Sequence, residues 1–167
     1  MKIAMACDHG GLTLKNAVAA WLENNGYEVA DFGTKTYDSC DYPDFALKAA
    51  EAVASGECAF GVVVCTTGIG ISIAANKVRG IRCALCSEPL SARMTRLHND
   101  ANMLALGGGM TGVNLALEIV KTFLETPFSQ EEKHARRIKK IAAIEEKYCK
   151  QPAVRAVGGF ADEGITR

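Results

Sequence analysis

The stretch with the clearest chemical potential is FGVVVCTTGIGISIAANK, residues 60–77. Cys65 ends an apolar run there, directly before a turn of two threonines, two glycines and one isoleucine at residues 66–70. Such a turn at the start of a helix can aim several backbone N–H groups at a phosphate or a developing oxyanion. The same amides could lower the thiol pKa from about 8.5 towards neutrality, making Cys65 a nucleophile or a general base. The simpler alternative is a buried strand-end cysteine followed by a tight turn.

Three better-known phosphate motifs do not fit this turn. No Gly-Lys-Ser/Thr follows it, so it is not a P-loop. Neither Gly10-Gly11 nor Gly68-x-Gly70 extends to the G-x-G-x-x-G fingerprint of dinucleotide-binding proteins. A cysteine phosphatase would need an arginine six positions after the cysteine, where this chain has Ile71.

Three other residues could take part in acid–base chemistry. Asp8 and His9 follow the first apolar run, and His98 lies close to the end of a helical pattern. Each has a structural alternative, because aspartate often caps the start of a helix and histidine can cap its end.

A basic run near the C-terminus offers a second kind of contact. Lys133 and Arg137 are four residues apart, so they share one helical face and could clamp an anion. A solvated face is the alternative for such a run. The three histidines form no H-x-H or H-x-x-x-H pair, so the sequence gives little support for a metal site.

Taken together, these residues suit one reaction. A base at a glycine-rich cradle, with Asp8 and His9 nearby and a cationic anchor, can abstract a proton beside a carbonyl and stabilise the resulting enediolate. That is the chemistry of an aldose–ketose isomerase.

The elements that must position these residues alternate along the chain. Short apolar runs predict strands at residues 2–6, 27–31, 60–65, 81–86 and 102–106. Helical patterns lie at residues 12–24, 43–55, 69–76, 89–97, 111–124 and 130–148. This alternation predicts an α/β three-layer sandwich with a five-stranded parallel Rossmann-like sheet. Ligands of such sheets bind at the carboxyl ends of the strands, and we expect Asp8, Cys65, Gly107–Gly109 and also His98 to border that rim.

Composition narrows the class of protein. The 167 residues predict one domain, residues 1–150, followed by a tail at 151–167. Lys+Arg and Asp+Glu are equal at 19 each, so charge does not point to nucleic acid or membrane, and the N-terminus is not a signal peptide. Seven irregularly spaced cysteines fit a reducing, cytoplasmic location. Cys83 and Cys86 match C-x-x-C, but inside an apolar run we favour a structural over a redox role.

An ordered set of motifs makes the chain resemble a known family. ACDHGG, DYPDFA, CTTGIGISIAANK, CSEP and RLHNDANMLALGG occur in this order between Met1 and about Lys150. Together they closely resemble the type B ribose-5-phosphate isomerases. The resemblance implies an interconversion of ribose 5-phosphate and ribulose 5-phosphate in the pentose phosphate pathway, without metal or cofactor. It also implies a homodimer or homotetramer whose active sites draw residues from two subunits.

The resemblance also assigns roles to single residues. Cys65 matches the base, Thr67 and the amides of Thr66, Gly68, Ile69 and Gly70 match the enediolate cradle, and His98 matches the residue that opens the furanose ring. The remaining matched residues bind the substrate: Asp8 the sugar oxygens, His9, Lys133 and Arg137 the phosphate, and Tyr42 and Asn99 the rest of the site.

Three departures from the family affect the choice of substrate. Gly109 stands where many relatives have an arginine, which removes one phosphate contact. Lys133 replaces another arginine and loses its two-pronged geometry, and Thr66 replaces a common glycine. An isomerase of another sugar or sugar phosphate, such as allose 6-phosphate, galactose 6-phosphate or a tetrose phosphate, therefore stays an alternative. A binding module without catalysis is another, but binding alone would not require a base.

Overall fold

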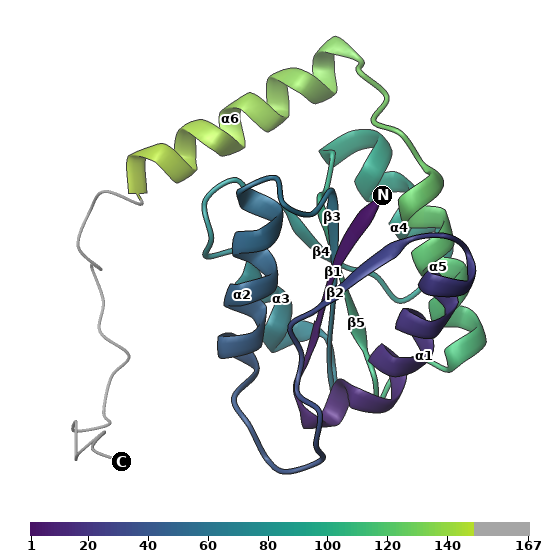
Figure 1. Ribbon diagram of the computed structural model, residues 1–167. Helices are drawn as coiled ribbons and strands as arrows, with labels where there is room; N and C mark the ends of the chain where they lie inside the picture. Colours follow the sequence, from purple (N-terminus) through teal and green to yellow (C-terminus); the bar gives the residue numbers. More distant parts are fainter. Residues whose placement is uncertain (149–167) are drawn as a thin grey trace, which may run out of the picture.

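The computed structural model describes residues 1–148, which form a parallel five-stranded sheet between two layers of helices (Figure 1). The strands are β1 (Lys2–Cys7), β2 (Glu28–Asp31), β3 (Phe60–Cys65), β4 (Cys83–Leu85) and β5 (Met103–Gly107). The helices are η1 (His9–Gly11, a 3-10 turn), α1 (Leu12–Asn24), α2 (Tyr42–Ala54), α3 (Ile69–Ala75), α4 (Pro89–Asn99), α5 (Val113–Glu125) and α6 (Glu132–Tyr148). The predicted α/β sandwich is confirmed, while the predicted domain end at 150 and the tail 151–167 lie outside the described residues.

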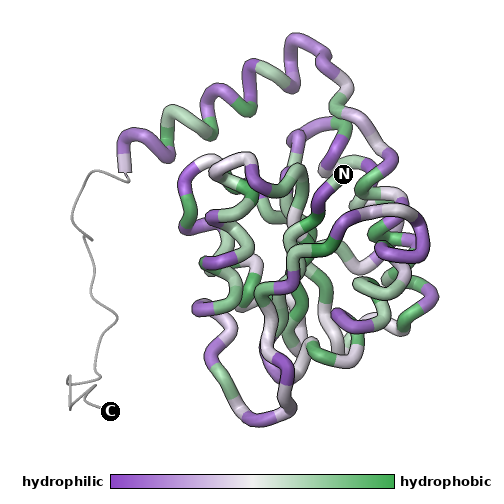
Figure 2. Tube along the Cα trace, viewed as in Figure 1, coloured by the Kyte–Doolittle hydropathy of each residue, from purple (hydrophilic) through white to green (hydrophobic). Residues whose placement is uncertain are grey.

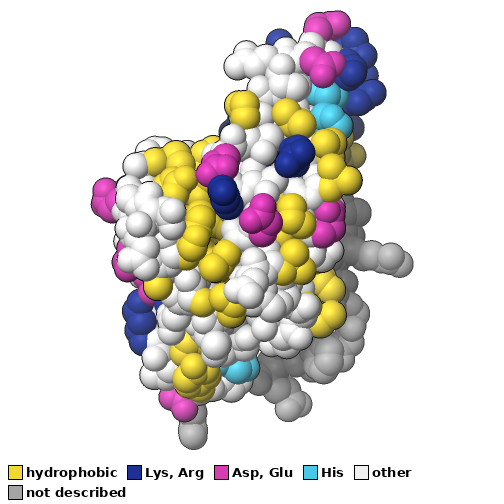
Figure 3. Space-filling view, turned by 90° about the vertical axis from the view of Figure 1, so that its right-hand side faces the viewer, with side chains coloured by type: hydrophobic (Ala, Val, Ile, Leu, Met, Phe, Trp, Pro, Cys, Tyr) yellow, Lys and Arg dark blue, Asp and Glu magenta, His cyan; other side chains and the backbone are white. Residues whose placement is uncertain are grey.

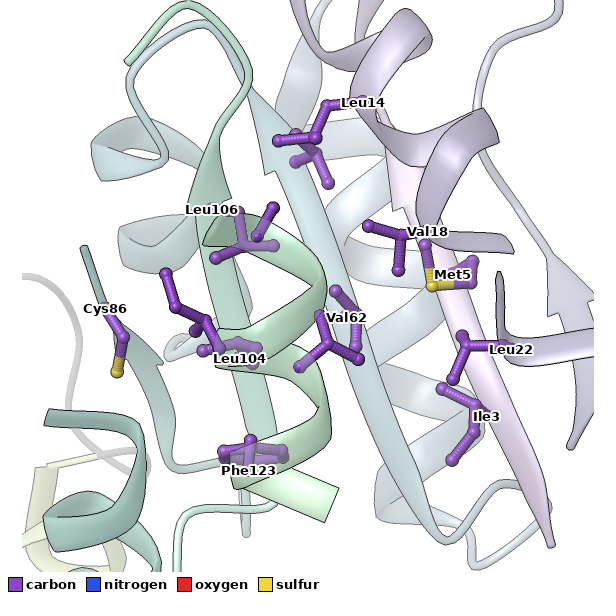
Figure 4. Close-up of a cluster of buried hydrophobic side chains, with 14 of the residues drawn as sticks. Ile3, Met5, Leu14, Val18, Leu22, Val62, Cys86, Leu104, Leu106 and Phe123 are labelled. Carbon is purple, nitrogen blue, oxygen red and sulfur yellow. The ribbon is translucent and has the colours of Figure 1, made fainter. Parts of the chain in front are cut away.

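The two helical layers follow from the alternation of side chains along each strand. Ile3 and Met5 of β1 point to the face covered by α1, α4 and α5, where they join a buried cluster with Phe123 (Figure 4). Ala4 and Ala6 alternate with Ile3 and Met5 along β1 and face α2 and α3 on the other side of the sheet. Because both faces are covered, the strands are apolar throughout rather than alternating, as is usual for parallel sheets.

The strand order determines where a ligand can bind. The order is β2-β1-β3-β5-β4, so the chain moves outward from β1 to β2 and then returns to the other side of β1. The carboxyl ends of β1, β3 and β5 lie side by side, because Cys7 pairs with Val64 and Cys65 pairs with Gly107. The loops after β1 and β3 leave to opposite faces, which creates the crevice where doubly wound sheets bind ligands.

Several element boundaries differ from the predicted ones for local reasons. The fourth strand is shorter than residues 81–86, since the Arg82 amide bonds to the side chain of Asn102 at 2.8 Å instead of to the ladder. The last helix begins at Glu132 rather than at Gln130, whose φ of +59° is incompatible with a right-handed helix.

The helix α6 lies outside the two layers of helices that cover the sheet. It projects over the edge of the sheet where the strands begin (Figure 1), and it is largely hydrophilic whereas the strands are hydrophobic (Figure 2). Throughout residues 1–148, no helix is both long enough and apolar enough to cross a membrane.

Candidate active site

Three loops meet at the carboxyl edge of the sheet. Asp8 follows β1, Cys65 ends β3, and a glycine segment, residues 107–109, follows β5. The Asp8 amide donates to Val64 O at 3.3 Å, and the Gly108 amide donates to Cys65 O at 2.7 Å. These backbone hydrogen bonds hold the three loops directly against one another, as the sequence predicts.

The turn after Cys65 depends on Gly68. This residue has φ +76°, and a Cβ at its position would lie 2.8 Å from the carbonyl carbon of Leu106. Only glycine combines this left-handed backbone with so close an approach. The turn directs the Gly68 amide at the Cys65 sulfur, 3.1 Å away, where it can stabilise negative charge on the thiol.

The rest of the cradle is built at the start of α3. The Ile69 amide donates to Thr67 Oγ1 at 3.2 Å, and the side chain of Thr67 is exposed beside the turn. Tyr42 comes from the first residue of α2 and packs on Gly70, where an added Cβ would lie 2.6 Å from the tyrosine ring. The structure therefore brings Tyr42 and residues 65–70 together.

Asp8 and His9 lie on the other side of the same crevice. Asp8 is buried and its Oδ1 accepts a hydrogen bond from the Gly11 amide at 3.0 Å, so it caps η1 as the structural alternative predicts. The Cys40 amide donates to His9 Nδ1 at 3.2 Å. With Nδ1 acting as an acceptor, a neutral His9 carries its proton on Nε2 and can donate it to an anion.

The prediction that His98 borders this rim is wrong. Helix α4 begins after the carboxyl end of β4 and runs back along the sheet, so its last turn reaches the edge where strands begin. There, Arg82 just before β4 donates through Nε to the carbonyl of Asn99 at 3.0 Å. Figure 3 shows histidine side chains at two opposite ends of the molecule.

Lys133 and Arg137 lie near His98 rather than near Cys65. Both are exposed on α6, where Lys133 pairs with Glu131 at 2.7 Å and Arg137 makes no ion pair within residues 1–148. His134, between them in the sequence, is buried and its ring centroid is 4.3 Å from that of His98. His134 is not among the residues predicted from the sequence, although its place in the basic run K-H-A-R-R was a usable signal.

A groove of about 600 Å³ lies under α6 at this second edge. Ile141, Ile144 and Tyr148 of α6 line one side, and Ile81 and Asn99 line the other. The residues expected at one active site thus divide into two groups, which we call the carboxyl-edge half (Asp8, His9, Tyr42 and residues 65–70) and the amino-edge half (His98, Asn99, Lys133 and Arg137).

The C-x-x-C pair belongs to the core. Cys83 and Cys86 lie in different buried clusters, on opposite faces of the sheet. Burial raises the pKa of Cys83 to about 12 and that of Cys86 to about 11. These properties agree with the structural role that the sequence favours. Within residues 1–148, no three His, Cys, Asp or Glu side chains gather as metal ligands would.

Comparison with known sequences identifies close relatives. The profile of the family described as Ribose/Galactose Isomerase matches residues 3–141. Ribose-5-phosphate isomerase B of Escherichia coli K12 is 47% identical over 146 residues, which cover 87% of this chain and 97% of the relative. A galactose-6-phosphate isomerase subunit of Clostridium acetobutylicum is 40% identical over 141 residues, which cover 84% of this chain and 82% of the relative.

Solved structures show the same similarity. Ribose-5-phosphate isomerase B of Clostridium thermocellum has a TM-score of 0.87 and 57% identity, with 89% of this chain and 99% of that chain covered. The Mycoplasma genitalium enzyme with bound ribulose 5-phosphate has a TM-score of 0.83 and 36% identity, with 87% and 97% covered. By the matched profile, the identities and the shared fold, this chain belongs to the ribose/galactose isomerase family.

Proposed function

We propose that this protein is an isomerase that interconverts ribose 5-phosphate and ribulose 5-phosphate through an enediolate. The relatives named ribose-5-phosphate isomerase B support this substrate pair. The observation that carries the mechanism is the Cys65 thiol held 3.1 Å from the Gly68 amide, at the carboxyl edge of the sheet.

In the proposed reaction, Cys65 is the base and the turn is the oxyanion cradle. The thiolate removes the proton from C2 of the open-chain aldose, and the electrons of the C–H bond form a C1–C2 double bond. The carbonyl oxygen at C1 becomes negative and is stabilised by Thr67 and the amides of residues 66–70. The C2 hydroxyl then passes its proton to the negative C1 oxygen, and Cys65 returns the abstracted proton to C1, which yields the ketose and regenerates the thiolate.

The remaining residues bind the substrate and open its ring. Asp8 and Tyr42 hold sugar oxygens, and His9 donates from Nε2 to the phosphate. Lys133 and Arg137 would supply the positive charge that a phosphate dianion needs. His98 would open the furanose by proton transfer, and Asn99 would line the site beside it.

A complete site requires a second copy of the chain. The two halves lie at opposite edges of the sheet, and a strand of six residues such as β3 spans roughly 20 Å. One chain therefore cannot place Cys65 and His98 on the same sugar. A homodimer, alone or paired into a tetramer, would join the carboxyl-edge half of one copy to the amino-edge half of the other.

Exposed apolar residues support such an association. Ile69, which belongs to the carboxyl-edge half, is 53% exposed, and Ile73, one turn further along α3, is 56% exposed. The groove under α6 offers the matching apolar wall of Ile141 and Ile144 beside the amino-edge half. A second copy that seats α3 against this groove would bury both surfaces and complete the site.

The function can be tested with a panel of sugars in heavy water. We expect ribose 5-phosphate to be converted fastest among pentose, hexose and tetrose phosphates and free sugars, with NMR as the readout. Deuterium should enter C1 of ribulose 5-phosphate, because the thiol exchanges its proton with solvent. Faster conversion of a hexose phosphate would indicate that a hexose phosphate is the substrate. Binding without any deuterium exchange would favour a non-catalytic binding module. The free thiols fit a reducing cytoplasm as the proposed location.

A further inference from the structure

The turn that ends α4 contains an unusual aspartate. Asp100 adopts φ +46°, a left-handed conformation that few residues other than glycine, asparagine and aspartate adopt readily. Its carboxylate lies between two arginines, with Oδ1 2.8 Å from Arg96 Nη1 and Oδ2 3.2 Å from Arg82 Nη2. This residue directly follows His98 and Asn99 in the amino-edge half.

Arg96 anchors this turn to the core. It is 6% exposed, and its guanidinium lies 4.7 Å from the ring centroid of Phe60. Nη1 also donates to Ala101 O at 2.5 Å, and Nε donates to Thr126 O at 3.2 Å. A buried guanidinium with these partners cannot shift without leaving its charge or a carbonyl unpaired, so it is a rigid support.

Arg82 holds the turn from the other side. Its Nε bridges the carbonyls of Asn99 and Asp100, both at 3.0 Å, and Nη2 donates to Asp100 O at 2.7 Å. The direction of the chain at residues 98–100 is therefore defined by two arginines and one carboxylate. His98 itself is exposed, and its ring contacts only His134 among the aromatic contacts of the described residues.

We propose that Asp100, clamped by Arg82 and Arg96, is a positioning residue that fixes the direction in which His98 points out of its own subunit. This inference rests on the proposed function, in which His98 opens the ring of a sugar bound to a second copy. A proton-transfer group must lie within hydrogen-bonding reach of its target, so its supporting turn must be rigid although the group is exposed.

The kinetic test uses Asp100→Asn, which keeps the left-handed backbone accessible and removes the charge that both arginines bind. We expect kcat/KM for ribose 5-phosphate to fall about 10-fold. A tetrose 4-phosphate cannot close a furanose ring, because its O4 carries the phosphate, and its kcat/KM should change less than about twofold. On a His98→Asn background, Asp100→Asn should cause no further loss, because it acts through His98.

A matched control and a spectroscopic readout separate positioning from general destabilisation. Glu57→Gln also replaces a carboxylate that binds a cation, Lys2 at 2.8 Å, but far from residues 98–100 in the sequence, and it should leave both substrates unaffected. The chain has three histidines, so the His98 ring signals can be assigned in NMR spectra by His98→Asn. Asp100→Asn should shift the His98 signals and leave those of His9 in place.

Two results would overturn the positioning role of Asp100. Unchanged His98 signals and unchanged kinetics in a folded Asp100→Asn protein would overturn the proposal, and so would equal losses on both substrates that persist without His98. If His98→Asn alone spares both substrates, the ring-opening role fails, while the NMR shift still decides whether Asp100 orients His98. Should Asp100→Asn not fold, Asp100→Gly keeps the backbone conformation and carries the same expectations.

Discussion

At the scale of single residues, the proposed chemistry depends on the contact between the Cys65 thiol and the backbone of the turn that follows it. Cys65 is 4% exposed, and the Gly68 amide is its hydrogen-bonding partner. In the proposed mechanism the thiol takes a proton from C2 of the sugar and returns it to C1. The same cradle cannot give a hydroxyl the acidity of a thiol, which makes serine a discriminating replacement.

We expect Cys65→Ser to lower kcat by about 10²-fold or more while the thermal unfolding temperature changes little, because the side chain keeps its size and ends a strand. Steady-state kinetics and calorimetry provide the two measurements. Cys58→Ser is the matched control: Cys58 is also buried, but it precedes the same strand at the other edge, so its loss should affect stability and spare kcat. Near-normal turnover in Cys65→Ser would place the base elsewhere.

The residues of the carboxyl-edge half could be predicted from the sequence because they follow strands directly, with the exception of Tyr42, which is matched by the family resemblance alone. Residues such as Asp8 and Cys65 need only the rule that parallel strands end at one rim. Arg96 could not be found in the same way. The sequence pattern of an amphipathic helix predicts that an arginine is exposed. Only the tertiary structure shows that Arg96 is buried against Phe60 and hydrogen-bonded to three polar partners.

At the scale of elements, the loops of the carboxyl-edge half are fitted to one another. A Cβ at Gly109 would lie 3.2 Å from both Cγ2 and O of Thr66, and a Cβ at Gly10 would lie 2.1 Å from Thr66 Oγ1. The Thr66 side chain thus fills the space between the loops after β1 and β5. The two departures at positions 66 and 109 are therefore physically linked, because bulk at one position limits bulk at the other.

We accordingly expect Gly109→Arg to work best together with Thr66→Gly, which frees the space that an arginine needs. The double variant should lower KM for ribose 5-phosphate by about 10-fold or more, since a charge-assisted hydrogen bond to phosphate is worth roughly 1.5–3 kcal/mol. KM for free ribose should stay the same or rise. Thr66→Gly alone is the control, and an unchanged KM in the double variant would mean that the phosphate site is already complete.

The contact between α4 and α6 should make stability depend on pH. Burial, and next the neighbouring His98, hold the pKa of His134 below its ordinary value of 6.5. Just below pH 6.5 the unfolded chain therefore binds more protons than the folded chain. The contribution of neutral His134 to the free energy of unfolding is thus present above that pH and is lost as the pH falls.

We expect the unfolding temperature of the wild type to fall more steeply between pH 7.5 and pH 5.5 than that of His134→Gln, which keeps a partner for Ser129 Oγ without titrating. Scanning calorimetry at both pH values measures the difference. Parallel slopes for the two proteins would show that His134 does not contribute to acid sensitivity.

His98 lies at the other edge of the sheet from the predicted one because of the direction of helix α4. A helix that joins two parallel strands must carry the chain back to the edge where the next strand begins. The end of α4 therefore lies opposite Cys65, as the structure shows. The whole length of β5 separates His98 from Gly107–Gly109, so the two segments lie at opposite edges of the sheet.

At the scale of the whole molecule, the two half-sites predict complementation between defective subunits. A mixture of Cys65→Ser and His98→Asn proteins, each nearly inactive on ribose 5-phosphate, should regain activity once subunits exchange. Random exchange at equal amounts makes half of the dimers mixed, and each mixed dimer has one intact site, so about a quarter of wild-type activity should return. Mass spectrometry of differently labelled subunits checks the exchange. Persistent inactivity despite exchange would mean self-contained sites.

The close approach of other backbone atoms to Gly11, Gly68 and Gly108 has a consequence for evolution. An added Cβ at any of these positions would meet a backbone atom of a neighbouring strand or loop at less than 3.0 Å. These positions therefore accept almost no substitution, whereas Lys133 and Arg137 are exposed, so the packing of the fold does not restrict their side chains. New sugar preferences within this lineage should arise by drift on α6 and around Thr66, while the loops that perform the proton transfer are inherited almost unaltered.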